Sequence, residues 1–401
     1  MSIDRVVSGM RPTGALHLGH YHGALKNWVK LQDEVPCLFF AADWHALTTH
    51  YDDPSLIESS TWEMLIDWLA SGVDPAKSSL FIQSQVPEHA ELHLLLSMIT
   101  PLGWLERVPT YKDQQEKLSE RDLATYGFLG YPLLQAADVL IYRATQVPVG
   151  ADQIPHIEMM REIARRFNHL YGKEKGFEEK VAETLTKLSG KQGKQYKELR
   201  TAYQEQGNAE ALGWAKTLLD SVQSLSETDR ERLFGYLAGT RKQILLEPQA
   251  RLTEASRMPG LDGQKMSKSY GNSITLREDK ESLTKKIRTM PTDPARVRRT
   301  DVGDPEKCPV WQLHLVYSDA PTREWVVKGC TSAGIGCIEC KQPVIDGVLK
   351  EQEPMRERAQ KYIDDPSLVR AIVADGRDKA RALAQETMRE VRDAMGLGYR
   401  S

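Results

Sequence analysis

Long hydrophobic runs are absent from this sequence of 401 residues. No apolar stretch approaches the roughly 20 residues that a membrane-spanning helix requires. The first residues, Met-Ser-Ile-Asp-Arg, also lack the basic and apolar regions of a signal peptide. We therefore expect a soluble, cytoplasmic protein with no membrane partner.

A strong excess of charge is also missing, because 53 basic and 56 acidic residues give a formal net charge of −3. A very basic protein can attract nucleic acid through its overall field. If this protein binds RNA, it must do so through local basic patches. The length exceeds that of one ordinary hydrophobic core, so we expect two or three domains.

Short apolar runs alternate with amphipathic helical segments from residue 1 to about residue 168, a pattern typical of a parallel α/β sheet. Residues 35–42 and 79–83 predict buried strands, and residues 54–70 predict the helix between them. In open sheets of this kind, ligands bind beyond the carboxyl ends of the strands. The fold class we expect is therefore α/β, with a Rossmann-like parallel sheet.

The stretch Arg11-Pro-Thr-Gly-Ala-Leu-His-Leu-Gly-His20 joins a short apolar run to a segment with helical periodicity. It predicts a strand, a tight turn and a helix whose first turn carries His17 and His20. Unpaired N–H groups and a positive dipole attract phosphate to a helix N-terminus, and two imidazoles add donors. Gly14 and Gly19 would let a nucleotide approach the backbone closely. The alternative is a solvated turn that happens to contain histidines.

A second stretch, Gly260-Leu-Asp-Gly-Gln-Lys-Met-Ser-Lys-Ser269, predicts a loop with two lysines. Such a loop by itself is usually a solvated turn. The histidine stretch followed by this lysine loop, however, resembles the two signatures of class I aminoacyl-tRNA synthetases. There, histidines and lysines hold the ATP phosphates while an amino-acid carboxylate attacks the α-phosphorus. The resemblance implies the catalytic residues His17, His20, Lys265 and Lys268, and ATP contacts from Arg11, Thr13, Gly19, Met266 and Ser267.

Asp138 interrupts an apolar helical run within residues 131–142. A buried carboxylate is costly unless it is paired or faces a polar ligand. Asp138 is therefore either paired with a neighbouring helix or part of a ligand site. A glycine-containing loop, residues 147–153, follows. His45, directly after the predicted strand 35–42, is either a ligand-site residue or a histidine satisfied at a helix start.

Tyr131, Asp138 seven residues later and the loop 147–153 together look like the tryptophanyl-tRNA synthetase family. The similarity runs over residues 5–168 and 246–398. In that family the aspartate accepts the indole N–H, which suits a group with one donor and no acceptor. The matching tyrosine and glutamine hold the α-amino group of the substrate. The resemblance implies a tryptophan site of Tyr131, Asp138, Gln153 and His45, with Gly150 and Asp152 at the ATP.

The activity implied is tryptophan–tRNA ligation, in which tryptophan and ATP form tryptophanyl-adenylate and the acyl group passes to tRNA(Trp). Catalysis would rest on positioning and charge stabilisation, with Mg²⁺ sharing the triphosphate charge. The family also implies a homodimer. One alternative is a tyrosyl-type class I synthetase, although a phenol calls for a second polar partner in the pocket. The other is a catalytically idle paralogue that binds tryptophan or tRNA.

The sequence predicts four segments: a catalytic domain (1–171), a helical insertion (172–243), the remaining catalytic region with the lysine loop (244–281), and a helical tRNA (anticodon)-binding domain (282–401). The insertion is long for the family. Its charges are mixed, which favours a solvated module over an RNA-binding surface, and its role is open. We expect a capping box at Thr228 and Glu231 and helices over 177–188, 196–204, 209–225 and 229–237.

The predicted tRNA-binding domain holds the densest basic stretches, residues 282–288 and 296–299. Arginines there would contact phosphates and so set affinity and salt dependence rather than sequence preference. A C-terminal apolar stripe, spaced for one helix face, is expected to be core. Its members are Ala384, Met388, Val391 and Met395.

Only five cysteines occur, and four of them lie within 33 residues: Cys308, Cys330, Cys337 and Cys340. Thiols in the cytoplasm stay reduced, so this clustering points to metal or catalysis rather than disulfides. Four thiolates suit either zinc or a [4Fe–4S] cluster. Some tryptophanyl-tRNA synthetases resemble this pattern and hold a [4Fe–4S] cluster in the tRNA-binding domain. That resemblance favours the cluster, with zinc and then free thiols as alternatives.

Overall fold

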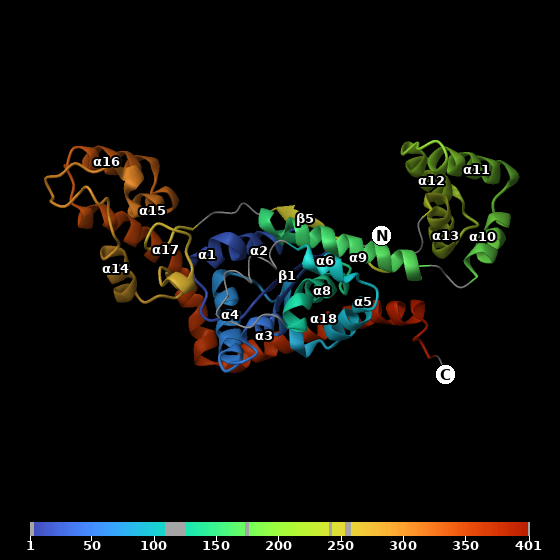
Figure 1. Ribbon diagram of the computed structural model, residues 1–401, viewed down its shortest axis with the longest axis horizontal. Coiled ribbons are helices and arrows are strands. Elements are labelled where there is room, and N and C mark those ends of the chain that lie inside the picture. The colour runs from blue at the N-terminus through green and yellow to red at the C-terminus, as the bar shows by residue number, and fades with distance from the viewer. Residues whose placement is uncertain (1–3, 109–124, 173–175, 240–242, 253–257, 400–401) are drawn as a thin grey trace.

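The computed structural model describes residues 4–108, 125–172, 176–239, 243–252 and 258–399. Within these residues a five-stranded parallel sheet forms the centre of the molecule, as Figure 1 shows. The strand order is β3-β2-β1-β4-β5, and each neighbouring pair is parallel. The expected α/β, Rossmann-like fold is confirmed. The strands are β1 (Val6–Met10), β2 (Cys37–Ala41), β3 (Ser78–Ile82), β4 (Gln146–Val149) and β5 (Gln249–Leu252).

Successive residues of a strand point to opposite faces of the sheet, and here both faces are buried. In β1, Val6 belongs to one hydrophobic core and Val7 to the other. In β2, Phe39 enters the first core and Phe40 the second. This explains why β2 is a continuous apolar run rather than an alternating one.

Helices cover both faces of the sheet. The first core receives side chains from α2 (Lys26–Leu31), α4 (Ile57–Ser71), α14 (Lys280–Arg288), α15 (Pro309–Tyr317) and α17 (Cys337–Asp364). The second receives them from α5 (Glu88–Ser97), α6 (Leu102–Glu106), α8 (Tyr126–Leu140) and α9 (Ile154–Tyr171).

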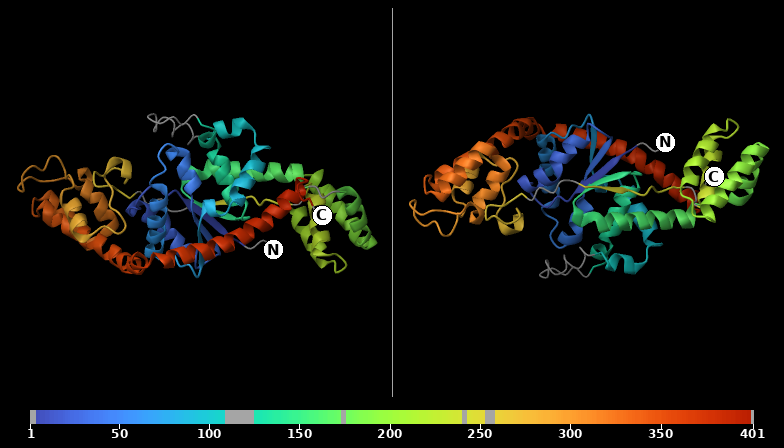
Figure 2. Two further views of the ribbon diagram at one scale, coloured as in Figure 1. Left: turned by 90° about the horizontal axis from the view of Figure 1, so that it is seen from below. Right: turned by 90° about the horizontal axis from the view of Figure 1, so that it is seen from above.

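The long C-terminal helix α18 (Pro366–Ala394) crosses the outer strand β3 and contributes to both cores (Figure 2). Contact is closest at Gly376, where an added Cβ would lie 2.1 Å from the carbonyl oxygen of Leu80. Only glycine fits there, because any side chain would push the helix away from the strand. The predicted stripe is core: Ala384, Met388 and Val391 are fully buried, and Met395, just beyond the helix, is partly buried against the second core.

Helices at the two ends of the molecule extend beyond the sheet (Figure 1). At one end lie α14, α15, α16 (Ala320–Thr331) and the start of α17. At the other end lie the four helices of the insertion: α10 (Phe177–Thr186), α11 (Gly190–Gln204), α12 (Glu210–Ser221) and α13 (Glu227–Ala238). No helix among the described residues is both long and apolar enough to cross a bilayer.

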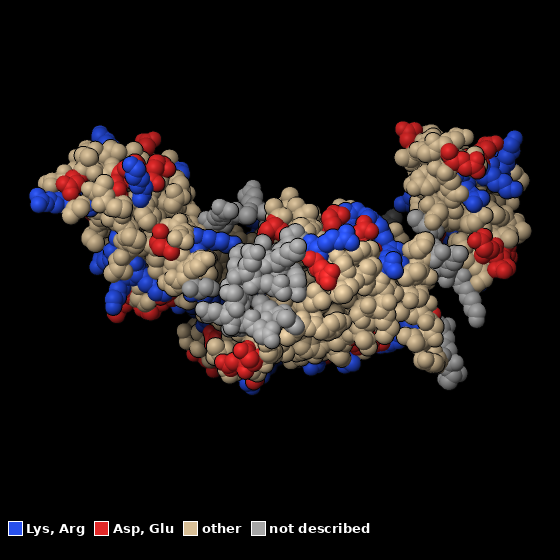
Figure 3. All heavy atoms as spheres, in the orientation of Figure 1, with Lys and Arg blue, Asp and Glu red and all other residues tan. Residues whose placement is uncertain are grey.

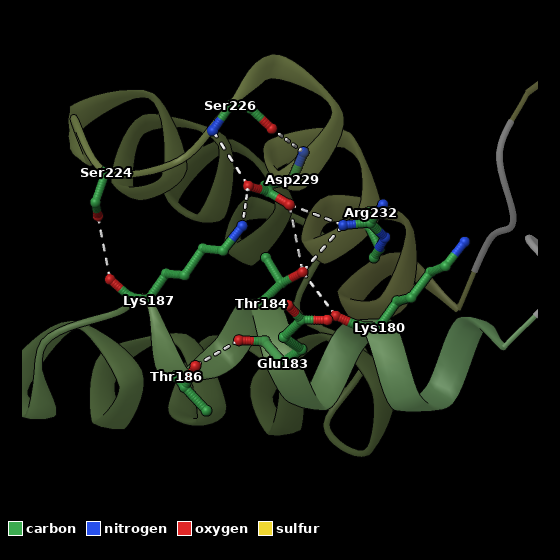
Figure 4. Close-up of polar contacts among 9 residues, drawn as sticks. All are labelled: Lys180, Glu183, Thr184, Thr186, Lys187, Ser224, Ser226, Asp229 and Arg232. Atoms are coloured by element: carbon green, nitrogen blue, oxygen red, sulfur yellow. Dashed lines mark hydrogen bonds and ion pairs between the residues drawn. The ribbon is translucent and has the colours of Figure 1, made fainter.

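The insertion helices pack around a hydrophobic core that is separate from the two cores of the sheet. The predicted capping box at Thr228 and Glu231 is wrong: Ser226 caps α13 and pairs with Asp229, because the helix begins at Glu227. Asp229 also accepts hydrogen bonds from Lys187 and Arg232, which ties α10 to α13 (Figure 4).

The second insertion helix also begins earlier than the predicted residue 196. Ser189 forms a capping box with Gln192, so the glycines that follow lie within the first turns of α11 rather than in a loop. A good N-cap supplies partners for the orphan N–H groups and outweighs the low helix propensity of two glycines.

The chain enters and leaves the insertion at neighbouring points. The side chain of Asn168, near the end of α9, accepts the N–H groups of Ile244 at 2.9 Å and Leu245 at 3.1 Å. Its amide group donates to the Leu245 carbonyl at 2.7 Å. One buried side chain therefore closes the catalytic fold across the base of the insertion.

Candidate active site

The residues that follow the carboxyl ends of the strands gather at one edge of the sheet. Arg11 follows β1, His45 lies on α3 (Asp43–His50) after β2, Gln83 follows β3, and Gly150 follows β4. Parallel strands place these ends side by side, as the strand pattern predicted.

The histidine signature lies between β1 and the short helix α1 (Leu18–His20). His17 is the N-cap of α1, and its Nδ1 accepts the N–H of Gly19 at 3.1 Å. His20 Nδ1 accepts the N–H of His17 at 3.2 Å, and the ring centroids lie 3.9 Å apart. A turn of π-helix, Tyr21–Leu25, follows directly, a feature often found at functional sites.

Both histidines are neutral at physiological pH. Burial, Lys268 and Lys265 lower the pKa of His17 to about 4. Burial, His17 and Lys268 lower the pKa of His20 to about 3. Each Nδ1 accepts a backbone N–H, so the single ring proton must be on Nε2. Each ring therefore offers one N–H donor, which can hydrogen-bond a phosphate oxygen while the ring stays uncharged.

The lysine loop lies against the histidine signature although it is more than 240 residues away in sequence. Lys268 Nζ donates to the carbonyl of Thr13 at 3.2 Å. The loop is held by Asn272, which accepts the N–H of Ser267 at 2.8 Å and donates to the carbonyl of Lys265 at 3.2 Å. The side chain of Met266 is buried and anchors the loop, whereas Lys265 is exposed.

Two further contacts fix the two signatures to each other. The Leu18 N–H donates to the Ile274 carbonyl, and the Leu276 N–H donates to the Leu16 carbonyl, each at 3.0 Å. Asp67 on α4 accepts both the Leu16 N–H and the guanidinium of Arg277. These backbone hydrogen bonds and the contacts of Asp67 could not be predicted from sequence, because they join segments that share no local pattern.

A cavity of about 410 Å³ opens beside the end of the sheet. Six of the predicted site residues line it: Arg11, His45, Tyr131, Asp138, Gly150 and Gln153. The remaining ones belong to the histidine and lysine loops or, in the case of Asp152, accept a hydrogen bond from Gln153 at 2.9 Å. The predicted substrate and phosphate residues thus fall into two neighbouring groups.

Asp138 faces this cavity and is also paired with three protein donors. It is 1% exposed and accepts hydrogen bonds from His45 at 2.8 Å, His89 at 2.6 Å and Gln83 at 2.7 Å. Burial by itself would raise the pKa of Asp138, but these histidines outweigh burial and hold it below its usual value. The two readings of Asp138 from sequence, a paired carboxylate and a ligand-site residue, are therefore compatible.

At the other end of the cavity, Tyr131 and Gln153 are joined by His156. His156 Nδ1 donates to Gln153 Oε1 at 2.7 Å, and Nε2 lies 3.4 Å from the Tyr131 hydroxyl. Sequence reasoning missed His156, although its position three residues after Gln153 on one helix face was an available signal. It also missed Gln83 and His89, which only the tertiary fold brings to Asp138.

The four clustered cysteines lie together at the far end of the molecule. Cys308 precedes α15, Cys330 lies in α16, and Cys337 and Cys340 occupy the first turn of α17. They line one cavity of about 20 Å³. In the part of the chain that the structure describes, no three His, Cys, Asp or Glu side chains are arranged to hold a metal ion. Burial and the other three cysteines raise the pKa of the Cys340 thiol to about 12.

Arg296, expected to contact phosphate, is buried beside these cysteines. Its guanidinium donates to the carbonyls of Ile335 and Arg299 and lies 3.8 Å from Cys330 Sγ. That expectation is wrong for Arg296, because its charge is used to hold the loop around the cysteines. Arg298 and Arg299 stay exposed.

Comparison with known proteins gives one consistent family. The family model described as tRNA synthetases class I (W and Y) matches residues 4–198 and 232–348. The tryptophan–tRNA ligase of Ralstonia nicotianae is 75% identical over 396 residues, covering 99% of both chains, and that of Thermotoga maritima is 44% identical over 98% of this chain and 100% of its own.

Among solved structures, tryptophanyl-tRNA synthetase from Campylobacter jejuni, complexed with ADP and tryptophan, superimposes with a TM-score of 0.73 at 28% identity. The match covers 98% of this chain and 100% of that one. With a family model matched over most of its length and relatives of high identity over all of it, the chain belongs to the class I tryptophanyl-tRNA synthetases.

Proposed function

We propose that the protein activates tryptophan with ATP and transfers it to tRNA(Trp). One observation carries the choice of amino acid: a buried, charged carboxylate, Asp138, faces the cavity that lies next to the phosphate-binding signatures. A carboxylate in an apolar wall suits indole, which has one N–H donor and no acceptor.

The opposite end of the cavity suits the amino-acid backbone. Oxygen atoms of Tyr131 and Gln153, which His156 links, can accept an α-ammonium group. Held there, the carboxylate of tryptophan would lie toward Arg11 after β1 and Gly150 after β4, which also line the cavity. The substrate is thus oriented by its two polar ends.

The signature residues act on the triphosphate. His17 and His20 donate Nε2–H groups, and Lys265 and Lys268 supply positive charge that stabilises the leaving pyrophosphate. Mg²⁺ enters with ATP and shares the triphosphate charge. No covalent nucleophile is required, since the tryptophan carboxylate itself attacks the α-phosphorus and the enzyme aligns the two. The ATP contacts proposed for the loops are Arg11, Thr13, Gly19, Gly150, Asp152, Met266 and Ser267.

The decisive experiment is pyrophosphate exchange into ATP, measured with each amino acid in turn. We expect exchange with tryptophan and none with tyrosine. Exchange with tyrosine would support the tyrosyl-type alternative, and tryptophan binding without exchange would support an idle paralogue. Lys268→Ala, which lacks the charge proposed to stabilise pyrophosphate, is the negative control.

For domain organisation we propose a catalytic domain over 1–171 and 244–281, an accessory helical module over 172–243 and a tRNA-binding region over 282–401. Three observations support the module: its own core, the closure of its base by Asn168, and the mixed charges of its surface (Figure 3). Replacing residues 173–240 by a short Gly/Ser linker should leave exchange largely intact. Loss of folding would show that the module shares the main core.

For tRNA binding we propose the end of the molecule that α14–α17 form. Exposed Arg298 and Arg299 line a groove of about 680 Å³ together with the N-terminus of α17 at Gly336 and Cys337. A helix N-terminus and arginines both favour phosphate. Arg298→Ala should weaken charging at limiting tRNA, flatten its salt dependence and leave exchange unchanged.

For the metal site we propose that Cys308, Cys330, Cys337 and Cys340 hold a [4Fe–4S] cluster, with zinc as the alternative. The donor set fits, because four thiols share one cavity and Lys341 adds a buried positive charge beside them. The cavity has room for about one water molecule, so the ligands must move apart to admit the group. When bound, the cluster would cross-link α15, α16 and α17.

The cluster is tested by anaerobic purification followed by iron, sulfide and zinc analysis. A brown protein with about four irons per chain would support the proposal. One zinc per chain would favour the alternative, and no metal would leave four ordinary thiols. Cys337→Ser should bleach the protein and impair tRNA charging while sparing exchange.

For quaternary structure we propose a homodimer through α5, α6 and the start of α8. Four large apolar side chains are exposed there: Leu94 at 56%, Met98 at 67%, Leu102 at 57% and Tyr126 at 66%. A cluster of exposed apolar residues marks an interaction surface, and a second copy is the occupant that the family favours. Met98→Glu should shift sedimentation from dimer to monomer; an unchanged profile would place the interface elsewhere.

A further inference from the structure

Four residues form a buried polar network behind the cavity wall. Asp138, His89 and Gln83 are each at most 1% exposed, and Tyr142 is fully buried. They come from separate elements: Gln83 from the turn after β3, His89 from α5, and Asp138 and Tyr142 from α8 and the residues just beyond it. Neither Gln83, His89 nor Tyr142 lines the cavity, so none of them is placed to touch a substrate.

The hydrogen bonds of this network fill one carboxylate oxygen and leave the other partly open. Oδ1 of Asp138 accepts from Gln83 Nε2 at 2.7 Å and from His89 Nδ1 at 2.6 Å. Oδ2 accepts only from His45 Nε2 at 2.8 Å among the described residues. A carboxylate oxygen offers about two acceptor positions. One acceptor position therefore remains, at Oδ2.

Tyr142 determines which ring nitrogen of His89 carries the proton. The Tyr142 hydroxyl lies 2.6 Å from His89 Nε2, its only hydrogen-bond partner within the described ranges. Burial, together with the charge of Asp138, raises the pKa of Tyr142 well above its ordinary value, so the hydroxyl keeps its proton. A hydroxyl that donates to Nε2 leaves the ring proton on Nδ1, where it points at Asp138.

Gln83 satisfies the carboxylate of Asp138 while one of its own polar atoms stays unpaired. Its Nε2 donates to Asp138, while its Oε1 is buried and has no hydrogen-bond partner among the residues that the structure describes. A buried orphan acceptor is costly and is rare in native proteins. This orientation of the Gln83 amide leaves Oε1 unpaired and directs Nε2 at Asp138.

We propose that Gln83 and His89 are positioning residues that determine tryptophan specificity, by saturating Oδ1 of Asp138 so that Oδ2 alone is left to accept the indole N–H. This proposal rests on the proposed function. A single open acceptor matches a single N–H donor. A phenol hydroxyl could donate to Oδ2, but the three donors around the carboxylate are already committed to it and cannot serve the phenol oxygen. The network thus favours tryptophan over tyrosine without a further contact to the substrate.

The test compares tryptophan with an isostere, 3-(benzothiophen-3-yl)alanine, in which sulfur replaces the indole N–H. The readout is the ratio of the two kcat/KM values in pyrophosphate exchange. We expect His89→Leu to reduce the wild-type preference for tryptophan about tenfold, because only tryptophan uses Asp138. A variant that merely disturbs packing lowers both values equally and leaves the ratio unchanged, which would overturn the proposal.

Milder variants keep the proposal testable if His89→Leu does not fold. His89→Asn can place an amide N–H near the position of Nδ1 and should restore most of the preference. Tyr142→Phe and Gln83→Leu should each reduce the preference at least twofold, and unchanged ratios in both would overturn the proposal. The matched control is His169→Leu, because His169 is exposed on α9. Absence of exchange with tryptophan in the wild type would instead refute the proposed function itself.

Discussion

Replacement of Asp138 by asparagine separates the charge of this side chain from its shape. Asparagine keeps one acceptor oxygen, which can stay with the two donors that now reach Oδ1, from Gln83 and His89. Its amide nitrogen then occupies the position of Oδ2, where the indole N–H is proposed to bind. The amide N–H of asparagine and the indole N–H, both donors, would then face each other, and no acceptor would remain for the indole.

The expected effect is large on tryptophan and small on stability. A hydrogen bond to a charged group contributes about 1.5–3 kcal/mol, which corresponds to a fall of roughly 10–150-fold in kcat/KM for tryptophan. Stability should fall by about 1 kcal/mol, because most donors of the network keep a partner. Asp138→Ala, by contrast, leaves three buried donors without an acceptor. It should lower stability by at least about 2–4 kcal/mol and also reduce activity.

The assay is pyrophosphate exchange at saturating ATP with tryptophan varied, alongside urea unfolding of all three proteins. The KM for ATP serves as the internal control, since Asp138 lies away from the histidine and lysine loops and that KM should stay within about twofold. Unchanged tryptophan kinetics in Asp138→Asn would refute the assignment of this carboxylate to the indole. Equal stability loss in both variants would refute the account of the network.

Three further predictions concern other parts of the molecule. Lys268→Ala should lower kcat more than it weakens ATP binding, because its charge is used mainly in the transition state; a change confined to the KM for ATP would make it a ground-state clamp. His20→Asn should flatten the pH dependence of stability. The native pKa of about 3 lies below the unfolded value of about 6.5, so the unfolded state binds more protons and stability falls as pH drops below 6.5, by about 2 kcal/mol at pH 5 for this residue. Urea unfolding at pH 7 and pH 5 measures the difference, and parallel losses in wild type and variant would contradict it. Asn168→Ala should destabilise the protein by about 2 kcal/mol, because the buried N–H groups of Ile244 and Leu245 lose their acceptor; an unchanged unfolding curve would show that the base of the insertion is held elsewhere.

Sequence alone was sufficient for the features that depend on local pattern. The apolar runs around β2 and β3 predicted buried strands to within two residues, and the C-terminal stripe predicted a core helix. The strand-to-helix turn also located the histidine signature, because ligand-binding residues in a parallel sheet follow its strands. The lysine loop was recognised only by its resemblance to the second class I signature. Helix starts were less certain, since Ser189 and Ser226 compete with nearby residues as caps and only the hydrogen bonds decide between them.

The tertiary structure decided what depends on contacts between distant segments. Asp138 was visible in the sequence as a carboxylate in an apolar run, but its donors come from positions 55, 49 and 93 residues away. No periodicity links Gln83, His89 and His45 to one carboxylate. Likewise, the neutral state of His17 and His20 follows from burial and from the lysine loop folding over them, and Arg296 is buried because the loop around the cysteines encloses it. The sequence shows which side chains are available and where each helix or strand places them. Burial and the distance to neighbouring groups decide whether a side chain is charged, which atom carries its proton and which residue it pairs with.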